Sequence, residues 1–260
     1  MIFKIFLAAL FTLATALTAA RPCKPTTTQA SWVSMPSLPS TGSADLSLPP
    51  PGMVLKKVAL GHGIQNYSCP ASDTATPAQL GALAALYDVT SLYPGTPRTG
   101  LNETPFNALS TILLWSQSIP LNLVNTEAAW PGTTSRPNVF PESSYGANTQ
   151  HPFLAAADIN IMPTIATIKF LGHHYFDQDS LPTFDLLTVG LKASVVKNES
   201  INAPLAANKG IIGSGAIAWL KLVDSGRGVS NGLSLVYRVI TAGGAAEPCR
   251  ASGAGNDGAT

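Results

Sequence analysis

The chain has 260 residues, of which 45% are hydrophobic and 11% are charged, and its 15 basic and 14 acidic residues nearly balance. The apolar fraction is large enough to form a core, which excludes a wholly disordered chain. The 22 glycines and 21 prolines argue against a coiled coil or a helical bundle. The balanced charge leaves no basic surface for nucleic acid. We therefore expect a globular protein that binds no nucleic acid.

The first twenty residues have the pattern of a secretory signal peptide. Lys4 precedes an apolar run from Ile5 to Leu17, and small residues follow up to Ala20. The apolar run has about thirteen residues, fewer than the roughly twenty that cross a bilayer as a helix. Residues 250–260 are small and polar, without the hydrophobic tail of a lipid-anchor signal. We predict cleavage after Ala20 and a secreted, extracellular product with no membrane anchor in the mature chain.

Composition divides the rest of the chain into three parts. Residues 21–52 are rich in Pro, Ser and Thr and are expected to form an extended leader with few buried contacts. Residues 53–249 are the expected β-rich domain, and residues 250–260 are the expected flexible tail. Residues 53–60 and 64–69 are two strand candidates, and Gly61, His62 and Gly63 between them suit a tight connection.

The middle of the chain carries an ambiguous segment, a helix and a loop. Residues 79–93 fit a helix, because Thr76 and Pro77 resemble a helix start, and equally a strand, because of their length and their final residues. Residues 106–118 are the best helix candidate, because Phe106, Leu109 and Leu113 recur at helical spacing. The loop over residues 120–152 is long enough to be functional or to cover other elements.

The C-terminal part looks like a series of short strands separated by turn residues. The candidates are residues 164–171, 173–176, 183–189, 191–196, 216–223 and 233–241. Such punctuation is typical of an antiparallel sandwich or barrel. We therefore predict a mostly β fold: a single antiparallel β-sandwich-like domain with one short helical insertion and a long loop.

Two short motifs suggest enzymes but lack the context that the chemistry needs. Gly213, Gly215 and Ala218 fit the dinucleotide fingerprint, yet the next segment looks like a strand and no acid lies at the ribose-binding distance. Asp224 opens an Asp-Ser-Gly like that of aspartic proteases, which has no second copy to complete the pair of carboxylates. We expect turns at both places, no cofactor, and neither NAD binding nor malate oxidation.

Histidines and aromatic residues supply the candidates for a ligand pocket. The candidates are His62, Gln65, Tyr67, His173, Asp177 and Trp130. The first five in one concave pocket, with shifted pKa values, would indicate an enzyme, whereas apolar filling would indicate a binding or structural protein. Trp130 is a candidate for stacking on a sugar ring. No metal site is expected, because neighbouring His173 and His174 would point to opposite faces of a strand.

Cysteines and glycosylation sequons are interpreted in the light of secretion. Cys23, Cys69 and Cys249 allow one disulfide and one unpaired thiol in an oxidising compartment. Three asparagines lie in glycosylation sequons: Asn66, Asn102 and Asn198. Asn102 has the most favourable context, a loop rich in Gly, Pro and Thr.

Three segments of the β-rich part each contain a motif of one known family. Residues 60–69 contain Gly-x-Gln-Asn-Tyr-x-Cys, residues 170–186 contain Gly-x-x-Tyr-Phe and Pro-Thr-Phe, and residues 216–249 contain Ala-Trp-Leu-Lys-Leu with a Tyr-Arg-Val ending. The chain thereby resembles a family of secreted proteins of filamentous fungi with bacterial relatives. Many members are automatically named malate dehydrogenase, and this sequence gives that name no support.

The resemblance implies a β-sandwich-like domain without an established activity, so it carries no catalytic residues. It also favours a strand for residues 82–90, against their local propensity. Relatives often have Cys where this chain has Ser91. Because domain termini are commonly close together, this departure leads us to predict a Cys23–Cys249 disulfide with Cys69 unpaired. The alternative is Cys69–Cys249.

The expected function is that of a secreted, non-catalytic extracellular or cell-wall-associated protein. Its partner would be a cell-wall polysaccharide or a host or cell-surface ligand. The alternative is a secreted hydrolase with an active site that no motif marks, because the chain contains no Gly-x-Ser-x-Gly nucleophile turn.

Overall fold

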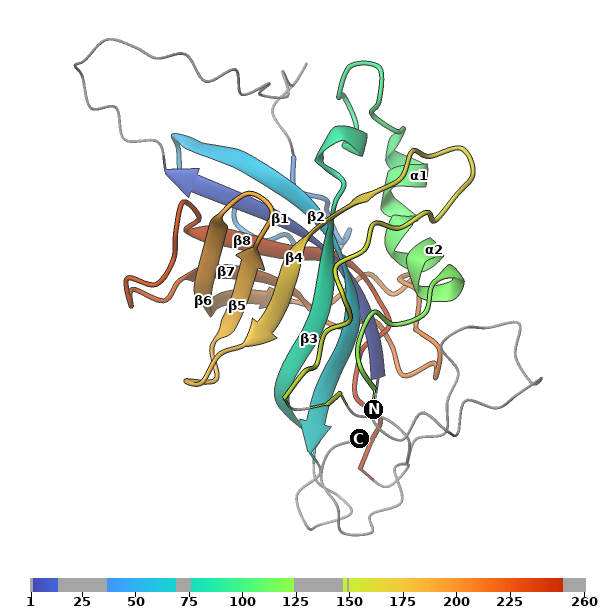
Figure 1. Ribbon diagram of the computed structural model, residues 1–260, viewed down its shortest axis with the longest axis vertical. Helices are drawn as coiled ribbons and strands as arrows, with labels where there is room; N and C mark the ends of the chain where they lie inside the picture. Colours follow the sequence, from blue (N-terminus) through green and yellow to red (C-terminus); the bar gives the residue numbers. More distant parts are fainter. Residues whose placement is uncertain (1, 14–36, 69–75, 124–146, 149, 250–260) are drawn as a thin grey trace.

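Antiparallel strands that follow one another along the chain form one sheet, which curls into a closed barrel in the order β1 to β8 (Figure 1). The structure is a computed structural model that describes residues 2–13, 37–68, 76–123, 147–148 and 150–249. Its strands are β1 (Ile2–Leu13), β2 (Met53–Ser68), β3 (Ala78–Asp88), β4 (Lys169–Phe176), β5 (Pro182–Leu186), β6 (Leu191–Ile201), β7 (Trp219–Asp224) and β8 (Leu235–Ala242). The mostly β, antiparallel fold that the sequence predicts is confirmed.

The helical insertion lies between β3 and β4 on the outside of the barrel (Figure 1). It contains a 3-10 turn (Thr90–Leu92), α1 (Glu103–Asn107) and α2 (Leu109–Ser116). The predicted helix over residues 106–118 is therefore confirmed, although it starts earlier and is interrupted at Ala108. Of the predicted long loop, residues 124–146 and 149 lie outside the described residues.

The expected turn at Gly61, His62 and Gly63 is wrong, because these residues lie inside the continuous strand β2. They pair with β3, where Gly63 faces Ala84. A Cβ added at Gly63 would overlap the backbone carbonyl of Leu83. Gly63 thus permits β2 and β3 to approach closely. Glycine is typical both of tight turns and of such close backbone contacts, so the sequence alone does not distinguish them.

The ambiguous segment that begins at residue 79 forms strand β3, as the family resemblance favours. Its residues are buried on both faces: Ala84 and Leu86 pack into one apolar cluster, and Ala85 and Tyr87 pack into another. A strand that is covered on both sides shows no alternation of polar and apolar residues. This double burial explains why the segment also fits a helix.

The two apolar clusters lie on opposite sides of the sheet. One contains strand residues such as Leu171, Phe184 and Val236 without any helix residue, so it fills the barrel. The other joins strand residues to Leu109 and Leu113 of α2, so it lies between the outer face and the helices. The alternation of side chains along each strand decides which cluster a residue joins.

The later strands follow the predicted series with shifted ends. The candidates over residues 164–171 and 173–176 are one strand, β4, and residues 163–165 form a turn before it. Both enzyme-like motifs are turns, as expected. Gly213 and Gly215 adopt positive φ angles, and the segment after them leads into strand β7 rather than the helix that a dinucleotide needs. Asp224 ends β7.

The leader packs against the barrel and the predicted signal peptide contributes a strand to it, and the sequence predicts neither. Residues 37–52 are extended, but they are packed more closely than expected: Leu46 is buried, and the backbone of Ser47 bonds Glu199 and Tyr237. Strand β1 lies within the predicted signal peptide and pairs with both β2 and β8. The tail over residues 250–260 lies outside the described residues.

Candidate functional site

The strand register brings two of the candidate histidines to one face of the sheet. His62 on β2 lies opposite Ala85 on β3, and Ala85 lies opposite His173 on β4. Residues directly opposite one another in a sheet project to the same side. Because Ala85 belongs to the cluster that includes α2, this row lies on the outer face of the barrel.

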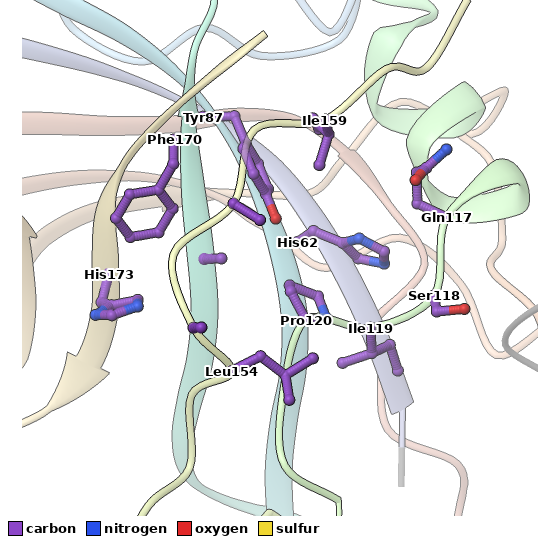
Figure 2. A pocket seen from close by; sticks show the side chains of 13 residues that line it. His62, Tyr87, Gln117, Ser118, Ile119, Pro120, Leu154, Ile159, Phe170 and His173 are labelled. Atoms are coloured by element: carbon purple, nitrogen blue, oxygen red, sulfur yellow. The ribbon is translucent and has the colours of Figure 1, made fainter. Parts of the chain in front are cut away.

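A pocket of about 180 Å³ lies over this row of residues. Its floor is the outer face of β2, β3 and β4, and its walls are the chain after α2 and the segment that precedes β4 (Figure 2). The lining residues are His62, Ala85, Tyr87, Gln117, Ser118, Ile119, Pro120, Leu154, Ala155, Ala157, Ile159, Phe170 and His173. None of them carries a carboxylate, an ammonium or a guanidinium group.

His62 contributes a neutral imidazole to the pocket. The residue is 1% exposed, and its Nε2 has no hydrogen-bond partner in the described part of the chain. Burial lowers the pKa of His62 from 6.5 to about 3. At neutral pH the ring is therefore uncharged, and a buried nitrogen without a partner is a ready contact for a polar atom of a ligand.

Tyr87 of β3 and His62 of β2 both line the pocket (Figure 2). Burial raises the pKa of Tyr87 to about 12, so the phenol stays protonated. Its ring packs edge-on against Phe170, with 6.3 Å between the ring centres. The pocket thus contains two uncharged polar groups set in an apolar and aromatic lining.

His173, in the floor of the pocket, is held by aromatic contacts. Its ring stacks on Phe153, with 3.8 Å between centres and 15° between planes, and it meets Phe170 edge-on at 5.2 Å. Burial lowers the pKa of His173, and the nearby Asp185 carboxylate partly opposes that shift. Asp185 is itself paired with Lys192 at 3.5 Å. His173 therefore presents a largely neutral ring at neutral pH.

The other candidate residues do not join this pocket. Gln65 and Tyr67 alternate with His62 along β2 and so belong to its opposite face. Gln65 is buried, and its Nε2 has no partner in the part of the chain that the structure describes; the Tyr67 hydroxyl donates to the carbonyl of Gly244 at 2.9 Å. Asp177 caps the β4–β5 turn by accepting the amide of Leu181, and it pairs with Arg227 at 3.1 Å. Trp130 lies outside the described residues.

His174 behaves as the strand geometry requires. It points away from His173, stacks on Phe184 with 4.2 Å between centres, and its Nδ1 contacts the carbonyl of Thr183 at 2.9 Å. Burial lowers the pKa of His174 to about 4. No group of three His, Cys, Asp or Glu residues in the described ranges is arranged to hold a metal ion.

Arg238 is a buried charge that the sequence does not single out. Its Nε and Nη2 donate to the carbonyl of Ala218 at 3.2 and 2.8 Å, and burial lowers the pKa of the guanidinium to about 10. Tyr87 and Phe170 of the pocket are also missing from the candidates. Tyr87 lies two residues after Ala85 and so shares its face of β3, and Phe170 is next to Leu171 and so lies on the opposite face of β4. These positions are readable only once β3 and β4 are recognised as strands.

The cysteines and sequons are placed as follows. Cys249 is buried and disulfide-bonded. Both cysteines that can pair with it, Cys23 and Cys69, lie outside the described residues, so the choice between them stays a prediction. Asn102, just before α1, and Asn198, in β6, are exposed, whereas Asn66 in β2 is half-buried. Glycosylation of all three also stays a prediction.

Comparison with known proteins gives one finding. A family model described as a protein of unknown function (DUF3455) matches residues 50–258, which includes β2 to β8 and excludes β1. No curated protein and no solved structure matches the chain. No helix in the described ranges is long and apolar enough to cross a membrane.

Proposed function

We propose that this chain, which belongs to the DUF3455 family of unknown function, is a secreted, non-catalytic binding protein. Its pocket on the outer face of the barrel takes a small, uncharged and mainly apolar molecule, or such a group on a larger cell-wall or cell-surface molecule. The observation that carries the proposal is the buried His62, which lines the pocket and whose Nε2 has no hydrogen-bond partner among the described residues. Residues 1–20 and the resemblance to secreted fungal proteins support the extracellular location.

The lining favours an uncharged ligand. Transfer of an ion from water into an apolar pocket costs several kcal/mol unless an opposite charge meets it. The lining residues supply no such charge, since His62 and Tyr87 are both neutral at neutral pH. One or two hydrogen bonds to these groups would orient a ligand whose remaining surface meets Ile119, Leu154 and Phe170.

The size of the pocket favours one ring over a chain of sugars. An apolar cavity of about 150 Å³ holds a benzene molecule, and this pocket has about 180 Å³. A polysaccharide would therefore be bound through a single terminal or substituent group. A partner of that kind is compatible with an extracellular or cell-wall role.

The hydrolase alternative finds weaker support in the same residues. Ser118 lines the pocket as a hydroxyl, but a serine nucleophile needs a base that accepts its proton near neutral pH. A histidine whose pKa lies at about 3 is a poor base at that pH. The lining also holds no carboxylate to orient the ring, as the triad mechanism requires.

Ligand-observed NMR on the secreted protein tests the proposal with a panel of neutral phenols, cyclic alcohols and cyclic ketones. We expect binding that His62→Leu and Tyr87→Phe each weaken by about tenfold, which is the worth of one hydrogen bond. Tyr93→Phe is the matched control, because the Tyr93 hydroxyl bonds the carbonyl of Ser37 outside the pocket.

Three results would contradict this function. They are a panel without any binder, binding that the pocket variants leave unchanged, and turnover of an ester or glycoside that His62→Leu abolishes. The last of these would support the hydrolase.

A further inference from the structure

Strand β1 fills a gap that is one strand wide. It runs antiparallel to β2 from Ile2 opposite Gln65 to Leu13 opposite Met53, and antiparallel to β8 from Ile5 opposite Ala242 to Phe11 opposite Leu235. β2 and β8 pair with β1 on either side of it, not with each other. Two inter-strand spacings place the backbones of β2 and β8 about 9 to 10 Å apart. We call this space the β2–β8 gap.

The strand that fills the gap belongs to the segment expected to be cleaved. β1 lies within the predicted signal peptide, residues 1–20, and outside the residues that match the family. β2 to β8 all lie within the matched residues. A mature chain that starts at Arg21 therefore has an intact row of seven strands whose two outer edges face each other.

The gap has the shape of a groove with a covered outer side. Helix α2 contacts β1, β2 and β8 together, so it spans the gap from outside the barrel (Figure 1). Apolar side chains flank the gap on both strands and are almost fully buried with β1 in place; they are Val58, Leu60 and Ile64 on β2, and Val236, Tyr237 and Val239 on β8. Loss of β1 leaves the backbone N–H and C=O groups along both edges unpaired and removes one neighbour of these side chains.

The chemistry of the gap selects an extended polypeptide as its occupant. Two facing rows of unpaired backbone N–H and C=O groups are satisfied together by one strand that runs between them. A second copy of the chain satisfies one row only, because its own β2 already carries β3 on the other side. The apolar flanks exclude a polar or highly charged strand.

We propose that removal of residues 1–20 turns the β2–β8 gap into a strand-binding groove for an extended, mainly apolar segment of another protein. The segment runs antiparallel to both β2 and β8, and its length is close to the 12 residues of β1. This site is separate from the small-molecule pocket and does not depend on it.

The probe is a synthetic peptide with the sequence of β1, flanked by lysines for solubility and added to the secreted protein. The control peptide carries Leu7→Pro and Ala9→Pro, which remove two N–H donors from the middle of the strand. Hydrogen exchange is measured at the amides of β2 and β8, with β5 as the internal reference. We expect the β1 peptide to slow exchange at β2 and β8 by about tenfold or more, and the control peptide to leave it unchanged.

Four results would overturn the proposal. These are retention of Met1 in the secreted protein, slow exchange at both edges of the peptide-free monomer, slow exchange that appears only with dimerisation, and no response to the β1 peptide. Tyr87→Phe separates the two sites, because it weakens small-molecule binding and leaves the peptide response intact. A failed groove with an intact pocket, or the reverse, is thus recognisable.

Discussion

Replacement of His62 by leucine tests the description of the pocket most directly, because it changes both stability and its pH dependence. His62 is almost fully buried and its Nε2 has no partner in the described residues. A buried polar atom without a hydrogen bond costs about 1 to 3 kcal/mol, and leucine has a similar size without a polar atom. We therefore expect His62→Leu to stabilise the protein by about 1 to 2 kcal/mol at neutral pH.

The pH dependence follows from the lowered pKa of His62. Folding holds this ring neutral, so the unfolded chain binds more protons at every pH between 6.5 and about 3. The free energy of unfolding of the wild-type protein therefore has its full value above pH 6.5 and decreases as the pH falls toward 3. At 1.36 kcal/mol per pH unit, and with the unfolded ring about half protonated already at pH 6.5, the loss from pH 6.5 to pH 4.5 is about 2 kcal/mol for His62.

His174 adds a second, similar loss. Its pKa is lowered to about 4, so its contribution falls by nearly the same amount over the same range. The wild-type protein should therefore lose about 4 kcal/mol between pH 6.5 and pH 4.5, and His62→Leu about half of that. Because folded domains are stable by only about 5 to 15 kcal/mol, this loss is a large part of the total stability.

Urea denaturation followed by tryptophan fluorescence, at about pH 7 and about pH 4.5, measures these differences. His151→Gln is the control, because His151 is exposed and lies outside the pocket, and it should leave both midpoints unchanged. The reasoning would be refuted by a variant that is less stable at pH 7, or by one that keeps the full acid sensitivity of the wild type.

Further outcomes are expected from the barrel and the surface. Gly63→Ala should lower the free energy of unfolding by more than about 3 kcal/mol, because the new Cβ has no space beside β3. Gly81→Ala is the control: its Cβ would meet a side-chain atom of Phe176 at 3.4 Å, so the urea midpoint should shift little. Phe184→Ala should cost about 3 to 5 kcal/mol, since the ring is buried inside the barrel, and thermal unfolding checks this value. Peptide mass spectrometry of the secreted protein should find glycans on the exposed Asn102 and Asn198, and their absence from both would contradict secretion through a glycosylating pathway.

Local patterns determined the class of the fold. Turn residues between short apolar segments predict an antiparallel β protein, and the spacing of Phe106, Leu109 and Leu113 predicts the helical insertion. These signals are local, because a turn or one amphipathic face is encoded within a few residues. The opposite directions of His173 and His174 were readable for the same reason, since alternation in a strand does not depend on its partners.

Tertiary packing decided what local patterns leave open. The segment of β3 looks as much like a helix as a strand, because the barrel interior covers one of its faces and α2 with its neighbours covers the other. Gly61 and Gly63 look like turn residues in the sequence. The actual reason for Gly63 is the close approach of Leu83, which lies on a different strand and is invisible in the local pattern. Each of these features has its cause in residues far away along the chain.

The candidate site divides in the same way. The sequence by itself identified His62 and His173 as residues of interest, but it grouped them with Gln65 and Tyr67, which alternation along β2 sends to the other side of the sheet. Only the register of β2, β3 and β4 places the two histidines in one row, and only the chain at residues 117–120 and 154–159 encloses that row as a pocket. Strand register and loop docking are set by the sum of many long-range contacts, so no local pattern contains them.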